Sequence, residues 1–257
     1  MLKPTGTRRK RVLAALVAAV FLTLSAGGCA SFDVTSPHDA REEASADAKG
    51  GTGPVDCAKA KCVALTFDAG PSENTPRLLD ILKKEKAHAT FFMLGENHVV
   101  KRPADVRRIA AEGHELANHT WSHEILTDLE PDQIRKELVR TQDAIAKITG
   151  KKPTLMRPPQ GKTDRTVSDV SRDLGLSQVL WSVTAKDYET NDSALIQKRV
   201  LEQTERDGII LLHDIYKGTV PAVPGILKEL KKRGYTIVTV SQLMAPAKLQ
   251  PGMVYRP

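Results

Sequence analysis

Asn118-His119-Thr120-Trp121-Ser122-His123 is the most informative stretch of this chain. Its two histidines are four residues apart, and on one helical turn this spacing would place both imidazoles on the same face, within reach of one metal ion. The pair alone is weak evidence, because many such pairs are ordinary surface or core histidines. Three further stretches give it weight: Thr66-Phe67-Asp68-Ala69-Gly70-Pro71, Arg157-Pro158-Pro159-Gln160-Gly161 and Leu211-Leu212-His213-Asp214.

Short apolar runs alternate with amphipathic segments from Cys62 onwards, which indicates strands separated by helices. Such alternation predicts a parallel sheet with covering helices, here an α/β barrel that is closed or nearly closed. The expected strands are 63–67, 89–94, 114–118, 154–157, 178–183, 208–213 and 235–240; seven rather than eight strands indicate an irregular barrel. The expected helices begin at Pro76, at Pro131 (ending at Gly150), at Asp192 or Ser193, and at Pro221, the last running to Arg233.

Five polar residues fall at the carboxyl ends of these expected strands. Barrels of this kind hold their active sites at that face, so the five side chains are expected to converge on one site. They are Asp68 after the first strand, His119 after the third, Arg157 at the end of the fourth, Asp187 after the fifth and His213 at the end of the sixth.

In their order and at their intervals, the four quoted stretches resemble the polysaccharide deacetylases, the NodB-type domains of carbohydrate esterase family four. The resemblance extends from about Cys62 to Leu243. It implies an irregular seven-stranded (β/α) barrel of the NodB type. It also implies a hydrolase that removes N-acetyl groups from N-acetylglucosamine-type residues of a polysaccharide, either peptidoglycan or a chitin-like polymer.

Hydrolysis of an acetamide requires a nucleophilic water, stabilisation of an oxyanion and a proton for the leaving amine, and a divalent metal supplies the first two. By resemblance, His119 and His123 hold that metal, which we expect to be zinc, with cobalt or another ion as alternatives, and Asp68 is the base. By the same resemblance His213 is the general acid, a task suited to a group that titrates near neutrality.

Arg157 matches the family arginine that pairs with an aspartate to hold the base, and Asp187 is the expected partner. Pro158, Trp181, Tyr188 and Leu211 are expected to line the substrate pocket; for the last three, plain core packing is the alternative. The pattern departs from the family at Gln160, Thr184 and Tyr188, where Tyr, Asp and Trp are common. We interpret His88, His98 and His114 as structural.

Ala69 breaks the pattern, because the family most often has a second aspartate there that completes the metal triad. Three protein ligands are usual for catalytic zinc. Three consequences remain open. The metal binds through two imidazoles and water, or Asp68 becomes the third ligand, or the site is empty and the protein only binds glycan.

The N-terminus has the features of a secretory signal. Five basic residues precede an apolar run over 12–24, which at 13 residues is short for a bilayer span, and small residues lead to Cys29. This resembles a bacterial lipobox, so we expect export and a lipid anchor on Cys29 at the outer face of the cell membrane, with ordinary secretion as the alternative. The expected organisation is a signal peptide over 1–28, Cys29 and a flexible linker over 29–60, a deacetylase domain over 61–245 and a tail over 246–257.

Charge and cysteines narrow the class of protein further. The net charge of +7 falls to +2 without the five basic residues of the leader, and no basic face of the kind that nucleic-acid binders carry is visible. With Cys29 lipidated, Cys57 and Cys62 remain to form a disulfide; a metal clip lacks two further ligands nearby. We expect a monomer whose partners are a polysaccharide and the membrane.

Other catalytic motifs are missing from the sequence. A zinc-protease signature needs Glu directly after the first histidine, and residue 120 is Thr. Neither a glycine-rich phosphate loop nor a serine nucleophile elbow is present. Two alternatives to the deacetylase remain: a catalytically impaired homologue that binds glycan, and an O-deacetylase of acetylated xylan.

Overall fold

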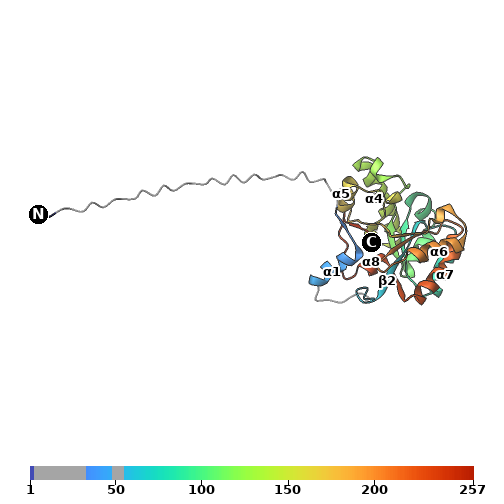
Figure 1. Cartoon of the computed structure of the whole chain (residues 1–257). Helices are drawn as coiled ribbons and strands as arrows, with labels where there is room; N and C mark the ends of the chain where they lie inside the picture. The colour runs from blue at the N-terminus through green and yellow to red at the C-terminus, as the bar shows by residue number, and fades with distance from the viewer. Residues whose placement is uncertain (3–32, 48–54) are drawn as a thin grey trace. The chain divides into compact units, whose positions relative to one another are not determined.

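The computed structural model describes residues 1–2, 33–47 and 55–257, and the part from Ser31 to Pro257 forms one compact unit (Figure 1). Residues 3–28 of the expected signal peptide, and Cys29, lie outside the described residues. The strands are β1 (Val34–Thr35), β2 (Lys61–Gly70), β3 (Thr90–Met93), β4 (Glu115–Asn118), β5 (Leu155–Met156), β6 (Ser177–Val179), β7 (Val183–Thr184), β8 (Ile209–His213), β9 (Tyr235–Val238) and β10 (Val254–Tyr255).

The helices connect these strands. The α-helices are α1 (Pro37–Asp47), α2 (Thr75–Lys84), α3 (Pro103–Ala111), α4 (Pro131–Thr149), α5 (Arg165–Asp173), α6 (Ser193–Gln203), α7 (Thr219–Lys232) and α8 (Val240–Met244), and short turns are η1 (Gly95–Val99), η2 (Leu126–Asp128), η3 (Pro159–Gly161) and η4 (Asp187–Glu189). Helices α6 and α7 lie side by side, as do α4 and α5 (Figure 1). The expected start signals are present: Pro131 opens α4, Asp192 caps α6, and Gly150 ends α4 with a positive φ of 78°.

The strands form one parallel sheet in the order β1-β10-β6-β5-β4-β3-β2-β8-β7, with β9 also paired to β2. The end strands of this order, β1 and β7, are not paired with each other in the described part of the chain, so the sheet is a curled, open barrel. The predicted irregular α/β barrel is confirmed, although the described residues form a sheet of ten strands instead of the expected seven. The fifth predicted strand, 178–183, was wrong in detail, because Leu180 to Ser182 interrupt it and separate β6 from β7.

The expected flexible linker is wrong where it overlaps residues 33–47. β1 pairs with β10, and α1 is held by Arg41, whose guanidinium donates to the carbonyl of Leu243 (2.7 Å) and to the carboxylate of Asp207 (2.6 Å). The expected tail is likewise built into the sheet, because β10 pairs with β6. Residues 33–47 are poor in large apolar residues, so their order depends on these long-range contacts.

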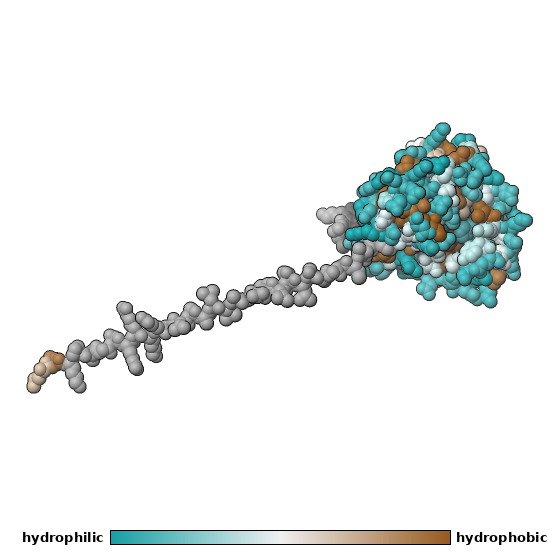
Figure 2. Space-filling model, turned by 90° about the horizontal axis from the view of Figure 1, so that it is seen from above, coloured by the Kyte–Doolittle hydropathy of each residue, from teal (hydrophilic) through white to brown (hydrophobic). Residues whose placement is uncertain are grey.

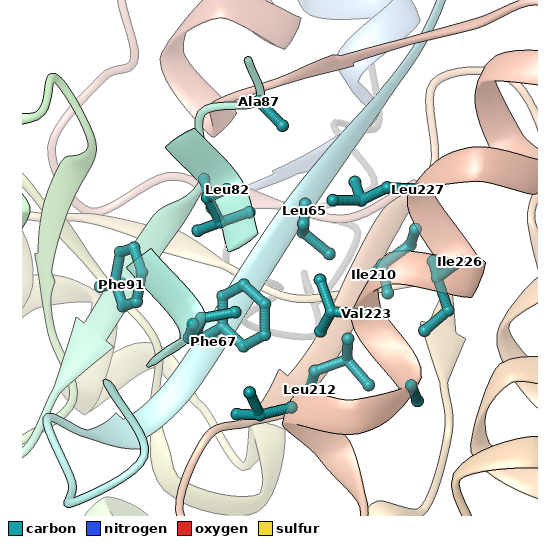
Figure 3. Packing of buried hydrophobic residues seen from close by; sticks show 14 of the residues in the cluster. Leu65, Phe67, Leu82, Ala87, Phe91, Ile210, Leu212, Val223, Ile226 and Leu227 are labelled. Atoms are coloured by element: carbon teal, nitrogen blue, oxygen red, sulfur yellow. The ribbon is translucent and has the colours of Figure 1, made fainter. Parts of the chain in front are cut away.

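Strand β2 runs between two hydrophobic layers and carries the first site residue at its end. Leu65 and Phe67 pack toward α2, α7 and the ring of Phe91, which stacks on Phe67 at 5.4 Å (Figure 3). Because successive residues of a strand point to opposite faces, Ala64 lies in the other layer and Asp68 shares its side of the strand. The predicted disulfide between Cys57 and Cys62 is present in this second layer, with Cα atoms 5.5 Å apart.

The surface shown in Figure 2 is mainly hydrophilic, with scattered hydrophobic residues. Within residues 33–47 and 55–257, no helix has the length and apolarity that crossing a membrane would require.

Candidate active site

A cavity of about 460 Å³ lies at the carboxyl ends of the strands. Eight residues predicted for the site line it, and two others, Arg157 and Asp187, are buried behind it. The lining residues are Asp68, His119, His123, Pro158, Gln160, Trp181, Thr184, Tyr188, Leu211, His213 and Tyr216.

The two histidines of the opening motif are close together, but they do not lie on a helix as their spacing suggested. Thr120 and His123 have positive φ angles of 72° and 68°, so residues 119–123 form an irregular loop after β4. The imidazole rings of His119 and His123 are nevertheless edge-to-face with centroids 5.0 Å apart. The irregular loop therefore brings the two imidazole rings together, as one helical turn would have done.

Glu137 of α4 holds this loop in place. Its carboxylate accepts hydrogen bonds from the backbone N–H of Trp121 (3.0 Å), from the backbone N–H of Ser122 (2.8 Å) and from the hydroxyl of Ser122 (3.0 Å). On the other side, the backbone N–H of Gly95 donates to the carbonyl of Thr120 at 3.1 Å. These contacts hold the backbone between the two histidines at both sides.

His119 presents one defined nitrogen to the cavity. Its Nδ1 lies 2.7 Å from the carbonyl oxygen of Arg157, which can only accept, so Nδ1 carries the proton and Nε2 is free to bind a metal. Burial lowers the pKa of His119 to about 4, despite the opposing charge of Asp68, and therefore keeps the ring neutral at physiological pH. Nε2 lies 3.8 Å from Oδ2 of Asp68. Burial also lowers the pKa of His123.

Asp68 is oriented by Arg157, which is fully buried. Nη1 of Arg157 donates to Oδ1 of Asp68 at 2.7 Å and to the hydroxyl of Thr66 at 2.8 Å, while Nε donates to the carbonyl of Val179 at 3.0 Å. Oδ2 is thereby left facing His119. The expected pairing of Arg157 with Asp187 is wrong, because Arg157 forms its ion pair with Asp68.

Asp187 instead holds His213. Its carboxylate accepts hydrogen bonds from Nδ1 of His213 (2.8 Å), from the backbone N–H of His213 (2.7 Å) and from the hydroxyl of Thr219 (2.7 Å). Burial alone would lower the pKa of His213, but the hydrogen bond and charge of Asp187, together with Asp68, outweigh it and raise that pKa above 6.5. A larger fraction of His213 is therefore protonated at a given pH than for an ordinary histidine.

The comparisons with known proteins agree with this arrangement. The family model for polysaccharide deacetylases matches residues 56–179. A peptidoglycan-N-acetylglucosamine deacetylase of Bacillus cereus is 36% identical over 190 residues, which is 72% of this chain and 88% of that protein. The solved structure named "T48 deacetylase with substrate" is 41% identical with a TM-score of 0.75, over 78% of this chain and 99% of that chain.

This chain belongs to the polysaccharide deacetylase family.

Other members of the family are longer. Peptidoglycan-N-acetylglucosamine deacetylase PgdA of Listeria monocytogenes is 38% identical over 196 residues, and these make up 76% of this chain but only 41% of the Listeria protein. The chain therefore spans less than half the length of this relative. Among solved structures, a CE4 family pseudoenzyme from Bacillus anthracis is 26% identical with a TM-score of 0.69, over 77% of this chain and 70% of that chain. The CE4 family thus includes a pseudoenzyme.

Ala69 occupies a bulge at the end of β2. The pairing of β2 with β3 shifts register between Asp68 and Gly70, and Ala69 has a φ of 64°. Aspartate is enriched at such left-handed positions and alanine is not. The backbone at position 69 would therefore suit an aspartate, whereas alanine offers no carboxylate there.

The residues present fit a divalent ion only in part. His119 offers a free Nε2, His123 lies beside it, and the carboxylate of Asp68 is the nearest acid. Within the part of the chain that the structure describes, no three His, Cys, Asp or Glu side chains are arranged to hold a metal together. An ion bound here would use the two imidazoles and complete its coordination with water or substrate, or with Asp68 after a side-chain rotation.

Three residues around the site were not predicted. Tyr216 lines the cavity with its ring edge-to-face against His213 at 5.5 Å. Glu137 of α4 accepts hydrogen bonds from the loop beside His123, at Ser122, and Thr219 of α7 donates one to Asp187. Tyr216 lies three residues after His213, and this short spacing was the signal that could have identified it from the sequence. Glu137 and Thr219 are far in the chain from the residues that they bind, so no such signal pointed to them. His98 and His114 have structural contacts, with Pro71 and with the backbone N–H of Ala89 respectively.

Proposed function

We propose that this protein is a metal-dependent deacetylase that removes N-acetyl groups from N-acetylglucosamine-type residues of a polysaccharide, peptidoglycan or a chitin-like polymer. The observation that carries this proposal is the convergence of a free imidazole nitrogen, an oriented carboxylate and a carboxylate-bound histidine on one cavity. His119, Asp68 and His213 supply these three groups.

A divalent ion held by His119 and His123 would supply a polarising Lewis acid for the acetyl carbonyl and for the attacking water. Zinc is the ion we expect, because imidazole ligands suit it and its open positions accept substrate. The neutrality of His119, which burial enforces, suits such a ligand.

The side chains of this chain divide the proton transfers between them. Oδ2 of Asp68 accepts a proton from the water whose oxygen attacks the acetyl carbon, while Arg157 holds Oδ1. Nε2 of His213 donates a proton to the amine as the carbon–nitrogen bond breaks, and Asp187 stabilises the imidazolium that makes this donation possible. Acetate and a free amine are the products.

Trp181, Leu211 and Tyr188 supply the apolar walls of the cavity. Leu211 is nearly buried and Trp181 partly so, which suits the methyl group of an acetyl substituent, whereas Tyr188 is 53% exposed and suits a sugar ring. The relatives named as peptidoglycan deacetylases support peptidoglycan as the substrate.

A glycan-binding homologue without turnover is the second candidate, and Ala69 favours it. The Bacillus anthracis pseudoenzyme supports the idea that this fold is retained without activity. An O-deacetylase of acetylated xylan would use the same groups, because an ester is cleaved by the same attack.

The experiment measures acetate release by residues 31–257 from N-acetylglucosamine oligomers, peptidoglycan and acetylated xylan. The variants His119→Gln and His213→Gln, which lack the proposed metal ligand and the proposed acid, serve as inactive controls. We expect release from the first two substrates that both variants abolish. Binding of glycan without release by the wild type would support the second candidate, and release from xylan alone would support the esterase.

We also propose that the chain is exported and anchored through a lipid on Cys29. The basic and apolar N-terminus supports this proposal. Cys29→Ala should release the protein from membranes, and a wild-type chain without lipid by mass spectrometry would contradict the proposal.

A further inference from the structure

A second, smaller hollow adjoins the active-site cavity. It has a volume of about 170 Å³ and is lined by Gln160, Gly161, Leu180, Trp181 and Arg256. Gln160 and Trp181 also line the active-site cavity. The two hollows are therefore neighbours that share one aromatic wall, an arrangement that suits two successive sugars of one polymer.

The shared wall is rigid. Gly161 has a φ of 69°, and a Cβ atom at this position would lie 2.9 Å from the indole of Trp181. Glycine is thus required both by the backbone conformation and by the close approach of η3 to the ring. Because the indole is partly exposed, it can present an apolar face to a sugar ring.

Arg256 also lines this hollow, and it lies on the C-terminal segment that the sequence suggested was a tail. The backbone N–H of Arg256 donates to the carbonyl of Thr35, and that of Leu180 to the carbonyl of Tyr255, each at 2.9 Å. Strand pairing therefore fixes the backbone position of Arg256 beside the hollow, whereas its side chain is exposed.

Among residues 33–45 and 55–257, the guanidinium of Arg256 has no carboxylate within ion-pair distance, in contrast to Arg41, Arg108 and Arg157. A guanidinium is a planar fork that binds carboxylates through two parallel hydrogen bonds. An anionic sugar polymer would form a charge-assisted pair with this group, which a neutral polymer would not.

We propose that the hollow between Trp181 and Arg256 is a subsite for a carboxylate-bearing sugar next to the residue that is deacetylated. The proposal rests on the proposed deacetylase function and narrows its substrate: the preferred polymer alternates amino sugars with sugars that carry a free carboxylate, as peptidoglycan strands without stem peptides do. Arg256 pairs with the carboxylate, and Trp181 contacts the ring.

The test compares Arg256→Gln with Arg77→Gln, which removes the same charge from an exposed position on α2 away from both hollows. The substrates are a peptide-free peptidoglycan strand fragment and an N-acetylglucosamine oligomer of equal length. Arg256→Gln should lower kcat/KM for the fragment about tenfold, as expected for loss of a charge-assisted contact, and leave that for the neutral oligomer within about twofold. Arg77→Gln should change neither.

Equal loss on both substrates, or no loss on either, would overturn the subsite. A second measurement separates this result from the deacetylase function: calorimetric binding of the fragment to His213→Gln, with and without Arg256→Gln. If the wild type releases no acetate but Arg256→Gln still weakens fragment binding, the subsite stands and the deacetylase proposal fails. If the fragment does not bind, the subsite is wrong.

Discussion

Replacement of Asp187 by Asn should lower the pKa of His213 and so reduce the fraction of His213 that is protonated and able to act as the acid. Asp187 binds the imidazole through Nδ1 at 2.8 Å, and a hydrogen bond to a charged group contributes about 1.5–3 kcal/mol. Loss of that contribution shifts the equilibrium from imidazolium toward imidazole by roughly 10- to 150-fold. Because the backbone N–H of His213 and the hydroxyl of Thr219 can still donate to the amide oxygen, the fold should survive.

The sign of the pH dependence follows from the raised pKa of His213. The protonated acid is present below that pKa and is lost as the pH rises through it, so kcat/KM should fall on the alkaline side. In Asp187→Asn this fall should begin at lower pH. The ion pair also contributes stability below the unfolded pKa of 6.5, which is lost as the pH rises through the folded pKa, so the variant should be more destabilised at pH 6 than at pH 9.

The assay is a histidine NMR titration of wild type and Asp187→Asn, with the His213 resonance assigned from His213→Gln, alongside the pH profile of kcat/KM. Asp192→Asn is the matched control, because Asp192 caps α6 outside the cavity and asparagine caps a helix equally well. An unchanged His213 titration in Asp187→Asn would refute the assignment of Asp187 as the group that holds the acid.

Three further predictions concern the metal loop and the disulfide. Ala69→Asp should tighten zinc binding at least about tenfold, measured by calorimetry, and should raise acetate release. Ala69→Asn is the control, because asparagine suits the same backbone but adds no carboxylate. Equal zinc affinities of the wild type and Ala69→Asp would show that another group is the third ligand. Glu137→Gln should weaken zinc binding roughly 10- to 100-fold, since it disturbs the loop between the histidines, and unchanged affinity would contradict that role. Cys57→Ser with Cys62→Ser should cost about 2 kcal/mol in urea unfolding without changing kcat, because the closed loop is short and remote from the site.

The barrel and the cluster of site residues were predictable because they depend on local signals. Apolar runs set the strands, and proline, aspartate and glycine set the helix ends. Once the strands are parallel, polar residues at their carboxyl ends must meet at one face, which is why His119 and His213 could be placed together from sequence.

The pairings inside the site were not predictable in the same way. Whether Arg157 meets Asp68 or Asp187 depends on which side chains enter the barrel interior, a result of sheet curvature rather than of spacing. The conformation of the histidine loop depends on Glu137, which is 14 residues from His123 in the chain. Residues 33–47 lack apolar periodicity, so their docking through Arg41 also could not be read from local pattern.

The most direct test of the account is a zinc titration of chelator-treated residues 31–257, with acetate release from an N-acetylglucosamine oligomer followed at each addition. The account predicts that activity is absent without metal, rises as one ion binds per chain, and is lost in His123→Gln together with the binding. Full activity in the chelated protein, or binding of zinc that neither His119→Gln nor His123→Gln weakens, would contradict it.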